Sequence, residues 1–280
     1  MQTRALLALA ALLPLSALAQ PKPAPPKSVR LYIFDCGVIK GLSVTSFNFK
    51  QGEIPARDMV VPCYLIVHPR GTLMWDVGVL PDSMIKTEGV PVTQGISTIT
   101  RTLKSQLAAI GYRASDMTYL AQSHYHSDHT ANSNDFAGAT WLVRQVERDA
   151  MFAEKAAGIM DQSSYSALKT AKTVIIKTDD YDVFGDGTVI LKSAPGHTPG
   201  HQVLFLKLAQ TGPVVLGGDL YHLPEERTMN RFPTFEFNVE QSRASRAAID
   251  AFVEKNKAQF WIEHDAATFA KQKKSPEFYQ

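Results

Sequence analysis

The chain has 280 residues, of which 45% are hydrophobic and 20% are charged, and its formal net charge is +2. This composition is typical of a globular domain with a sizeable core. The near balance of charge lacks the basic excess of nucleic-acid-binding domains, so we expect no nucleic-acid partner.

The first 19 residues have the pattern of a cleaved signal peptide. A basic start, MQTR, precedes a short apolar run, and Ala17-Leu18-Ala19 fits the small-x-small cleavage pattern. The alternative is a membrane anchor, but the run is short for a span of about 20 residues and Pro14 interrupts it. We therefore expect export to the periplasm or the medium, with no membrane association after cleavage. Residues 20–28 predict a Pro-rich spacer, followed by one domain over 29–280.

Runs rich in β-branched and aromatic residues predict strands. In chain order these cover residues 29–37, 60–69, 71–78, 117–123, 139–144, 173–177, 188–194, 202–209, 213–219 and 259–265. Pro69-Arg70-Gly71 predicts a hairpin turn. Apolar residues at steps of three and four from Ile96 to Ile110 predict a helix, and residues 145–157, 163–171 and 240–256 predict further helices. Such alternation indicates a layered α/β architecture.

The two cysteines, Cys36 and Cys63, both fall in predicted strands near the start of the domain. An exported chain can join such a pair in a disulfide. Two separate buried thiols are the alternative, and the spacing of the two residues does not decide between them.

The segment SHYHSDHT, which follows a predicted strand, carries the densest group of chemically reactive side chains. It places His124, His126, Asp128 and His129 within six positions. In an extended segment, residues two apart point to the same side, and those beyond a turn approach from another direction. Imidazole and carboxylate together suit a borderline metal such as zinc. Downstream, His197, Asp219 and His264 follow other strand-like runs and can converge on the same cleft.

Other readings explain this pattern less well. A solvated His-rich loop accounts for neither Asp128 nor the distant residues. A serine hydrolase needs a nucleophile on a tight turn such as G-x-S-x-G, which the sequence lacks. A structural zinc site would close around four ligands, usually with cysteine, and both cysteines lie far away in sequence.

H-x-H-x-D-H, followed by PGHTPGH, an aspartate after a strand and a late histidine, resembles the metallo-β-lactamase superfamily from about Leu31 to Asp265. Within it, RLYIFDCG, VPCYLIV, WDVG, LAQSHYHSDH and IEHD look most like the quorum-quenching N-acyl-homoserine lactonases. The resemblance implies an αββα sandwich with two zinc ions at one edge. It assigns His124, His126 and His197 to one zinc, and Asp128, His129 and His264 to the other. Asp219 would bridge both, and Asp76 would support the site.

The resemblance implies opening of a small lactone by attack of a hydroxide shared by the two ions. Two such ions lower the pKa of a shared water toward about 7, and Asp128 is a candidate carrier of the proton to the leaving oxygen. Zinc is the expected metal, with iron, cobalt and manganese as alternatives. A β-lactamase or another ester or amide hydrolase is the second hypothesis, and a non-catalytic exported metal- or ligand-binding protein is the third.

Other subfamilies fit the ligand pattern less well. Class B1 and B2 β-lactamases use a downstream cysteine, class B3 enzymes lack the bridging aspartate, and flavodiiron-type oxidases have glutamate where this chain has His126. Glyoxalase II shares all seven ligand types and differs mainly around PGHTPGH and in the early strands.

One departure from the lactonases concerns the substrate. They usually carry a tyrosine three residues beyond the bridging aspartate, where this chain has His222, with Tyr221 one residue earlier. Either side chain is a candidate hydrogen-bond donor to the substrate carbonyl, or both pack at the rim. His201 is expected to support a ligand or to pack in the core, and His68, beside the predicted turn, is expected at the surface. Phe232, Phe235 and Phe237 are candidates for an acyl-chain groove or for the core.

Overall fold

The computed structural model describes residues 22–154 and 160–280. The predicted signal peptide lies outside these residues. Of the predicted spacer, residues 22–28 contain no helix or strand, and Pro26 is buried against the domain. No helix in the described part of the chain combines the length and the apolar character needed to cross a membrane.

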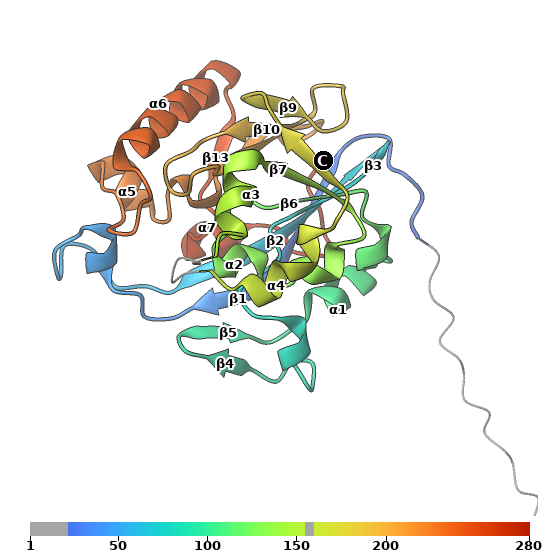
Figure 1. Cartoon of the computed structure of the whole chain (residues 1–280), viewed down its shortest axis with the longest axis horizontal. Coiled ribbons are helices and arrows are strands. Elements are labelled where there is room, and N and C mark those ends of the chain that lie inside the picture. Colours follow the sequence, from blue (N-terminus) through green and yellow to red (C-terminus); the bar gives the residue numbers. More distant parts are fainter. Residues whose placement is uncertain (1–21, 155–159) are drawn as a thin grey trace, which may run out of the picture.

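Two sheets form the centre of the molecule (Figure 1). In spatial order, the first contains β4 (Val92–Gln94), β5 (Ser97–Ile99), β1 (Arg30–Ile39), β2 (Met59–His68), β3 (Gly71–Trp75), β6 (Tyr119–Ala121), β7 (Thr140–Arg144) and β8 (Thr173–Ile176). The second contains β13 (Gln259–Trp261), β12 (Gly212–Leu216), β11 (Gln202–Leu208), β10 (Val189–Ser193) and β9 (Asp180–Asp182). All the predicted strands are present, and the predicted turn joins β2 to β3, with His68 paired to Gly71.

Alternation along the strands separates the layers, because successive side chains point to opposite faces of a sheet. On β1, Leu31 and Ile33 pack between the two sheets against residues such as Leu204, whereas Tyr32 and Phe34 pack on the outer face of the first sheet. That outer face is covered by helical residues such as Leu107 and Met151, and α6 (Val239–Asn256) covers the outer face of the second sheet through Ile249 and Val253. The predicted αββα sandwich is therefore confirmed.

The helices are α1 (Leu103–Ala108), α2 (Ser127–Thr130), α3 (Gln145–Met151), α4 (Gln162–Tyr165), α5 (Pro224–Met229), α6 (Val239–Asn256) and α7 (Ala266–Lys271). The prediction over 240–256 is confirmed by α6, whose N-cap Asn238 accepts a hydrogen bond from the backbone N–H of Gln241. The predictions over 145–157 and 163–171 are met by the shorter helices α3 and α4, and residues 155–157 lie outside the described part of the chain.

The helix predicted from Ile96 to Ile110 is wrong in its first half. Ile96 and Ile99 belong to the β4–β5 hairpin, in which β5 pairs with the end of β1 and Val38 lies opposite Thr98. The helix begins only at Leu103, after Thr102 caps it by accepting a hydrogen bond from the N–H of Ser105. Sheet pairing at the edge of the sandwich overrides the helical spacing of the apolar residues.

Cys36 and Cys63 form a disulfide, with their Cα atoms 5.8 Å apart. The bridge joins β1 to β2 near a bulge in the pairing between Asp35 and Val38. Both cysteines are buried in the core on the outer face of the first sheet. Of the two alternatives left open by the sequence, the structure therefore contains the bridge.

Candidate metal centre

The seven predicted ligands all follow the ends of strands. The loop after β6 carries His124 and His126 and continues into α2, which contains Asp128 and His129. His197, Asp219 and His264 lie shortly beyond β10, β12 and β13. One edge of the first sheet and one edge of the second therefore supply ligands to the same place.

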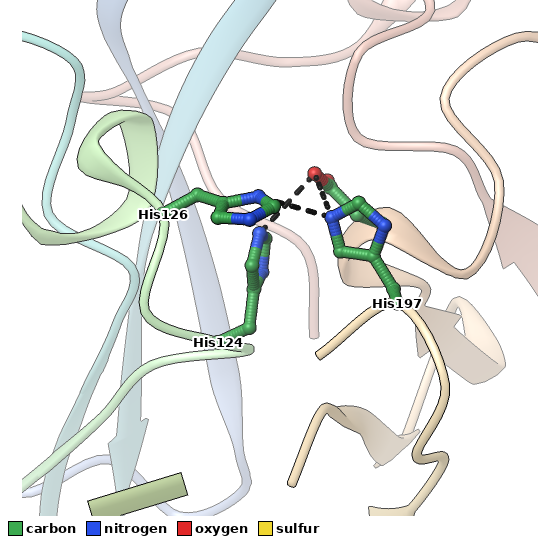
Figure 2. A group of neighbouring side chains, drawn as sticks. His124, His126 and His197 are labelled. Carbon is green, nitrogen blue, oxygen red and sulfur yellow. Dashed lines mark hydrogen bonds and ion pairs between the residues drawn. The ribbon is translucent and has the colours of Figure 1, made fainter. Parts of the chain in front are cut away.

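His124, His126, His197 and Asp219 form the first group, and one ligand atom from each lies within 4.8 Å of the others. Figure 2 shows the three imidazole rings turned toward one another. Nε2 of His197 lies 3.1 Å from Nδ1 of His126. Nε2 of His124 and Nε2 of His197 each lie 3.3 Å from Oδ2 of Asp219.

The second group contains Asp128, His129, His264 and Asp219, and one ligand atom from each again lies within 4.8 Å of the others. Nε2 of His129 lies 3.2 Å and Nε2 of His264 lies 2.9 Å from Oδ1 of Asp219. Both nitrogens are 3.6 Å from Oδ2 of Asp128. Asp219 is thus shared, with one carboxylate oxygen facing each group.

These residues fit a pair of bound cations. Two ligands on a tetrahedral zinc with bonds of 2.0–2.1 Å are expected about 3.3 Å apart, which is close to the spacings seen here. Nε2 of His124, His129 and His264 and Oδ1 of Asp219 are buried and have no hydrogen-bond partner among the described residues. Buried polar atoms without partners are costly, and a cation in each group satisfies them.

Two histidines of the first group, His124 and His126, favour the neutral imidazole, the form that binds metals, whereas Asp219 and Glu236 outweigh burial and raise the pKa of His197. Burial and the neighbouring His129 hold the pKa of His124 well below its usual range, and burial and His197 do the same for the pKa of His126. On the other side, the carboxylates of Asp219, Asp76 and Asp128 outweigh burial and raise the pKa of His129. In that environment a cation takes the place of a proton.

Asp76 has the supporting role that the resemblance implies. Its Oδ2 accepts a hydrogen bond from Nδ1 of His129 at 2.8 Å, and its Oδ1 accepts one from the N–H of Ser123 at 2.7 Å. Its backbone is in the left-handed region, with φ at 51°, which is costly for a residue with a Cβ. Strain of this kind persists when the surrounding contacts require it.

His201 supports a ligand rather than binding in either group. Its Nδ1 donates to the carbonyl of Ala194, and its Nε2 accepts from the N–H of Asp219 at 3.0 Å. Burial and the nearby His197 lower its pKa to about 3, so the ring stays neutral. The site packs closely here, because a Cβ on Gly218 would lie 2.7 Å from Nε2 of His201.

Glu147 is a supporting residue that no motif in the sequence marks. Its buried carboxylate accepts hydrogen bonds from the N–H of Tyr125, the N–H of Gly200 and the hydroxyl of Thr198. It therefore ties the loop of His124 and His126 to the loop of His197. Burial raises its pKa to about 7.

The structure separates the two candidates for contact with substrate. The hydroxyl of Tyr221 donates to Asp250 at 2.9 Å, and its ring packs in the core beneath α6. Tyr221 is therefore not placed to act in the site, which corrects the expectation from sequence. The ring of His222 lines the site, and its Nε2 lies 3.1 Å from Oδ2 of Asp219.

The expectation that His68 is a surface residue is wrong. Its side chain is 1% exposed and stacks on Phe184 with the ring centroids 4.1 Å apart. Nδ1 accepts from the N–H of Arg70, so Nε2 donates to Asp186 at 2.8 Å. The turn exposes Arg70, while the last residue of β2 remains packed at the far end of the sandwich.

A cavity of about 370 Å³ opens onto the two groups. His126, Asp128, Asp219 and His222 line its polar side. The other side is mostly apolar, with side chains from Ile39, Leu42, Met59, Val79, Ile96 and Phe235. Phe235 is thus at the cavity, whereas Phe232 packs beneath Arg246 and Phe237 is exposed.

The sequence profile of the metallo-β-lactamase superfamily matches residues 56–256. This chain belongs to that superfamily. Within it, the N-acyl homoserine lactonase AttM of Rhizobium radiobacter is 30% identical over 260 residues, which cover 90% of this chain and 98% of the relative. The N-acyl homoserine lactonase AiiA of Bacillus thuringiensis subsp. kurstaki is 27% identical, covering 74% and 82%.

Solved structures agree with this placement. An N-acyl homoserine lactone hydrolase with N-hexanoyl-L-homoserine bound at its catalytic metal centre superposes with a TM-score of 0.73 at 26% identity, over 90% of this chain and 99% of that one. The dizinc lactonase AidC shares the fold, with a TM-score of 0.63 at 17% identity over 94% and 97%. With a buried His/Asp metal cluster, this member of the superfamily is a metal-dependent hydrolase.

Proposed function

We propose that this protein opens the lactone ring of N-acyl homoserine lactones with two zinc ions. The observation that carries the proposal is the position of Asp219, whose two oxygens face two separate ligand groups. A single ion would leave one of these groups without a partner. The similarity to the N-acyl homoserine lactonases supports this choice of substrate.

Zinc ions in the two groups would acidify a shared water, so that a hydroxide nucleophile is present near neutral pH, and would polarise the carbonyl. The first ion would be held by His124, His126 and His197, and the second by Asp128, His129 and His264. Asp219 would hold the two together. The residues around them fix the rings, as in the hydrogen bond from Nδ1 of His264 to the carbonyl of Val60.

Asp128 moves the proton in this proposal. The water releases one proton to solvent when it becomes hydroxide, and its second proton passes from the attacking hydroxide to the ring oxygen, which leaves as an alcohol while the carbonyl becomes a carboxylate. Asp128 is the second residue of the short helix α2, lines the cavity and belongs to the second group. Its carboxylate can therefore accept the proton from the nucleophile and donate it to the departing oxygen.

The cavity favours a neutral substrate with an apolar tail. Its lining contains no lysine or arginine among the described residues. A β-lactam antibiotic carries a carboxylate, which a protein normally binds with such a cation. An acyl homoserine lactone carries none, and its acyl chain matches the wall formed by Leu42, Val79 and Ile96. We therefore place β-lactamase activity second.

We also propose that the protein acts outside the cytoplasm, in the periplasm or the medium. The sequence pattern of residues 1–19 supports export. The disulfide between Cys36 and Cys63 adds independent support, because structural disulfides persist mainly in oxidising compartments. Fractionation of the native host, with detection of the mature chain, tests this part of the proposal.

A substrate panel tests the reaction. The purified protein is given acyl homoserine lactones of several chain lengths, simple lactones and β-lactams, and proton release is followed. We expect ring opening of the acyl homoserine lactones, and its loss in His126→Ala. If the metal-loaded protein hydrolyses β-lactams but no lactone, the assignment of the substrate is wrong. If the His126→Ala variant retains full lactone opening, the mechanism is wrong.

A further inference from the structure

His222 resembles a ligand in its placement, although it belongs to neither of the two groups. Its Nε2 is buried, has no hydrogen-bond partner among the described residues and lies 3.1 Å from Oδ2 of Asp219. The ligand nitrogens of His124 and His197 lie 3.3 Å from the same oxygen. Three imidazoles therefore approach Oδ2 at nearly the same distance.

Glu226 fixes which nitrogen of His222 carries the proton. One oxygen of Glu226, Oε2, accepts hydrogen bonds from the backbone N–H groups of His222 and Leu223. The same oxygen lies 3.2 Å from Nδ1 of His222. Because Oε2 accepts from two backbone N–H groups and faces Nδ1, Nδ1 carries a hydrogen, and Nε2 is the nitrogen that faces the site, where a cation can take the place of a proton.

The side chain of Glu226 is itself held in place by its neighbours. Glu226 lies in α5, is 0% exposed and has Nη2 of Arg246 at 3.6 Å from its Oε1. Arg246, on α6, also donates from Nε to the carbonyl of Leu220, two residues before His222. A carboxylate that accepts from the outer nitrogen of an imidazole is the usual companion of a metal-binding histidine, because it orients the ring and raises its basicity.

We propose that His222 is a further metal ligand, positioned by Glu226 on the side of Oδ2 of Asp219. The inference rests on the metal centre of the proposed function and adds a ligand to it. His222 lies outside the four-residue groups whose ligand atoms are all within 4.8 Å of one another. Its Nε2 would therefore have to move toward the ion held by His124, His126 and His197, and it would bind that ion as an additional ligand beside the shared oxygen.

Metal affinity and coordination test this role without using activity. We would compare the wild type with His222→Phe, His222→Tyr and Glu226→Gln by competition against a chelator for zinc. Cobalt(II)-loaded proteins would be compared by visible absorption, which strengthens as the coordination number of cobalt falls. Glu225→Gln is the matched control, because Glu225 is the neighbour of Glu226 on α5 and pairs with Arg57 near the surface.

We expect His222→Phe and His222→Tyr to lower zinc affinity ten- to a hundredfold and to strengthen the cobalt absorption, with a smaller loss of affinity in Glu226→Gln. Glu225→Gln should behave as the wild type. Unchanged affinity and an unchanged cobalt spectrum in a folded His222→Tyr protein would overturn the inference, even in an enzyme that opens lactones. If the wild type opens no lactone but these variants lose metal, the result would support His222 as a ligand and would reject the proposed substrate.

Discussion

The carboxylate of Asp76 accepts a hydrogen bond from Nδ1 of His129 at a distance of 2.8 Å. This contact aims Nε2 of His129 at Asp219 and accounts for the aspartate of WDVG in the sequence. Removing the charge should weaken the metal centre while leaving the ligands in place. We expect Asp76→Asn to lower zinc affinity ten- to a hundredfold, measured by chelator competition.

Asp82→Asn is the control for this change. Asp82 is also buried and accepts two backbone N–H bonds, from Leu103 and Lys104 at the start of α1. The substitution Asp82→Asn should therefore lower the free energy of unfolding by about 1–2 kcal/mol, as the loss of a helix cap does, without altering zinc affinity. Equal zinc affinity in Asp76→Asn and the wild type would show that the contact does not position His129.

Metal removal should lower the stability of the protein. A bound cation would satisfy the buried atoms at the site that have no partner among the described residues, including Oδ1 of Asp219. At free zinc a hundredfold above the dissociation constant, the stabilisation is about 2.7 kcal/mol for each ion. Thermal unfolding with and without a chelator measures it, and added zinc should restore the transition whereas magnesium, which prefers oxygen ligands, should not. An unfolding midpoint that does not change when the chelator is added would contradict the binding of a metal ion at this site.

Glu147 should make stability depend on pH. Burial raises its pKa to about 7 from an ordinary value of 4.5, so folding favours its protonated form. The stability from this group is complete below pH 4.5 and is lost as pH rises through about 7. Relative to Glu147→Gln, the wild type should therefore lose on the order of 3 kcal/mol between pH 5 and pH 8, measured by chemical unfolding. Parallel pH profiles for the two proteins would exclude this role.

Ile96 should determine preference for long acyl chains. It is half-exposed at the apolar side of the cavity, next to β5. We expect Ile96→Asp to raise KM about tenfold for long-chain lactones, with kcat and the short-chain KM little changed, because only the chain loses apolar contact. Val90→Asp is the control, since Val90 is equally exposed nearby but does not line the cavity. Equal chain-length profiles for the two variants would place the acyl chain elsewhere.

The disulfide should stabilise the fold without touching the chemistry. Cys36 and Cys63 close a loop of 27 residues on the outer face of the first sheet. Such a loop predicts a loss of about 3.5 kcal/mol in Cys36→Ser/Cys63→Ser, measured by urea unfolding. Reductant should destabilise the wild type and leave the double variant unchanged. Insensitivity of both proteins to reductant would mean that the thiols are free in solution.

The strands and the convergence of the seven candidate ligands could be predicted from sequence because their signals are local. The long apolar runs of β1, β2 and β11 allow little else, and H-x-H-x-D-H places four side chains within six residues. The start of the helix before Gly111 could not be predicted, since Ile96 and Ile99 also satisfy a strand and only pairing with β1 decides. The hairpin turn indicated exposure for His68, but its burial depends on Phe184, more than a hundred residues away.

The supporting carboxylate of Glu147 could not be predicted either, because its partners are distant in the sequence. Glu147 acts on Tyr125 and Thr198, which lie 22 and 51 residues away, so no local motif marks it. The direction of Tyr221 depends on Asp250 in α6, and the neighbouring His222 turns the other way into the site. Sequence could name both residues but could not tell which faces the cavity.

The ligands are divided between the two sheets, and this has a consequence for maturation. The loop after β6 leaves the first sheet, whereas His197, Asp219 and His264 follow strands of the second. A chain whose halves have not yet closed offers only part of the coordination sphere, so high-affinity capture of the ions must come last in assembly. Metal supply in the compartment where the two halves meet would then limit how much of the polypeptide becomes active enzyme.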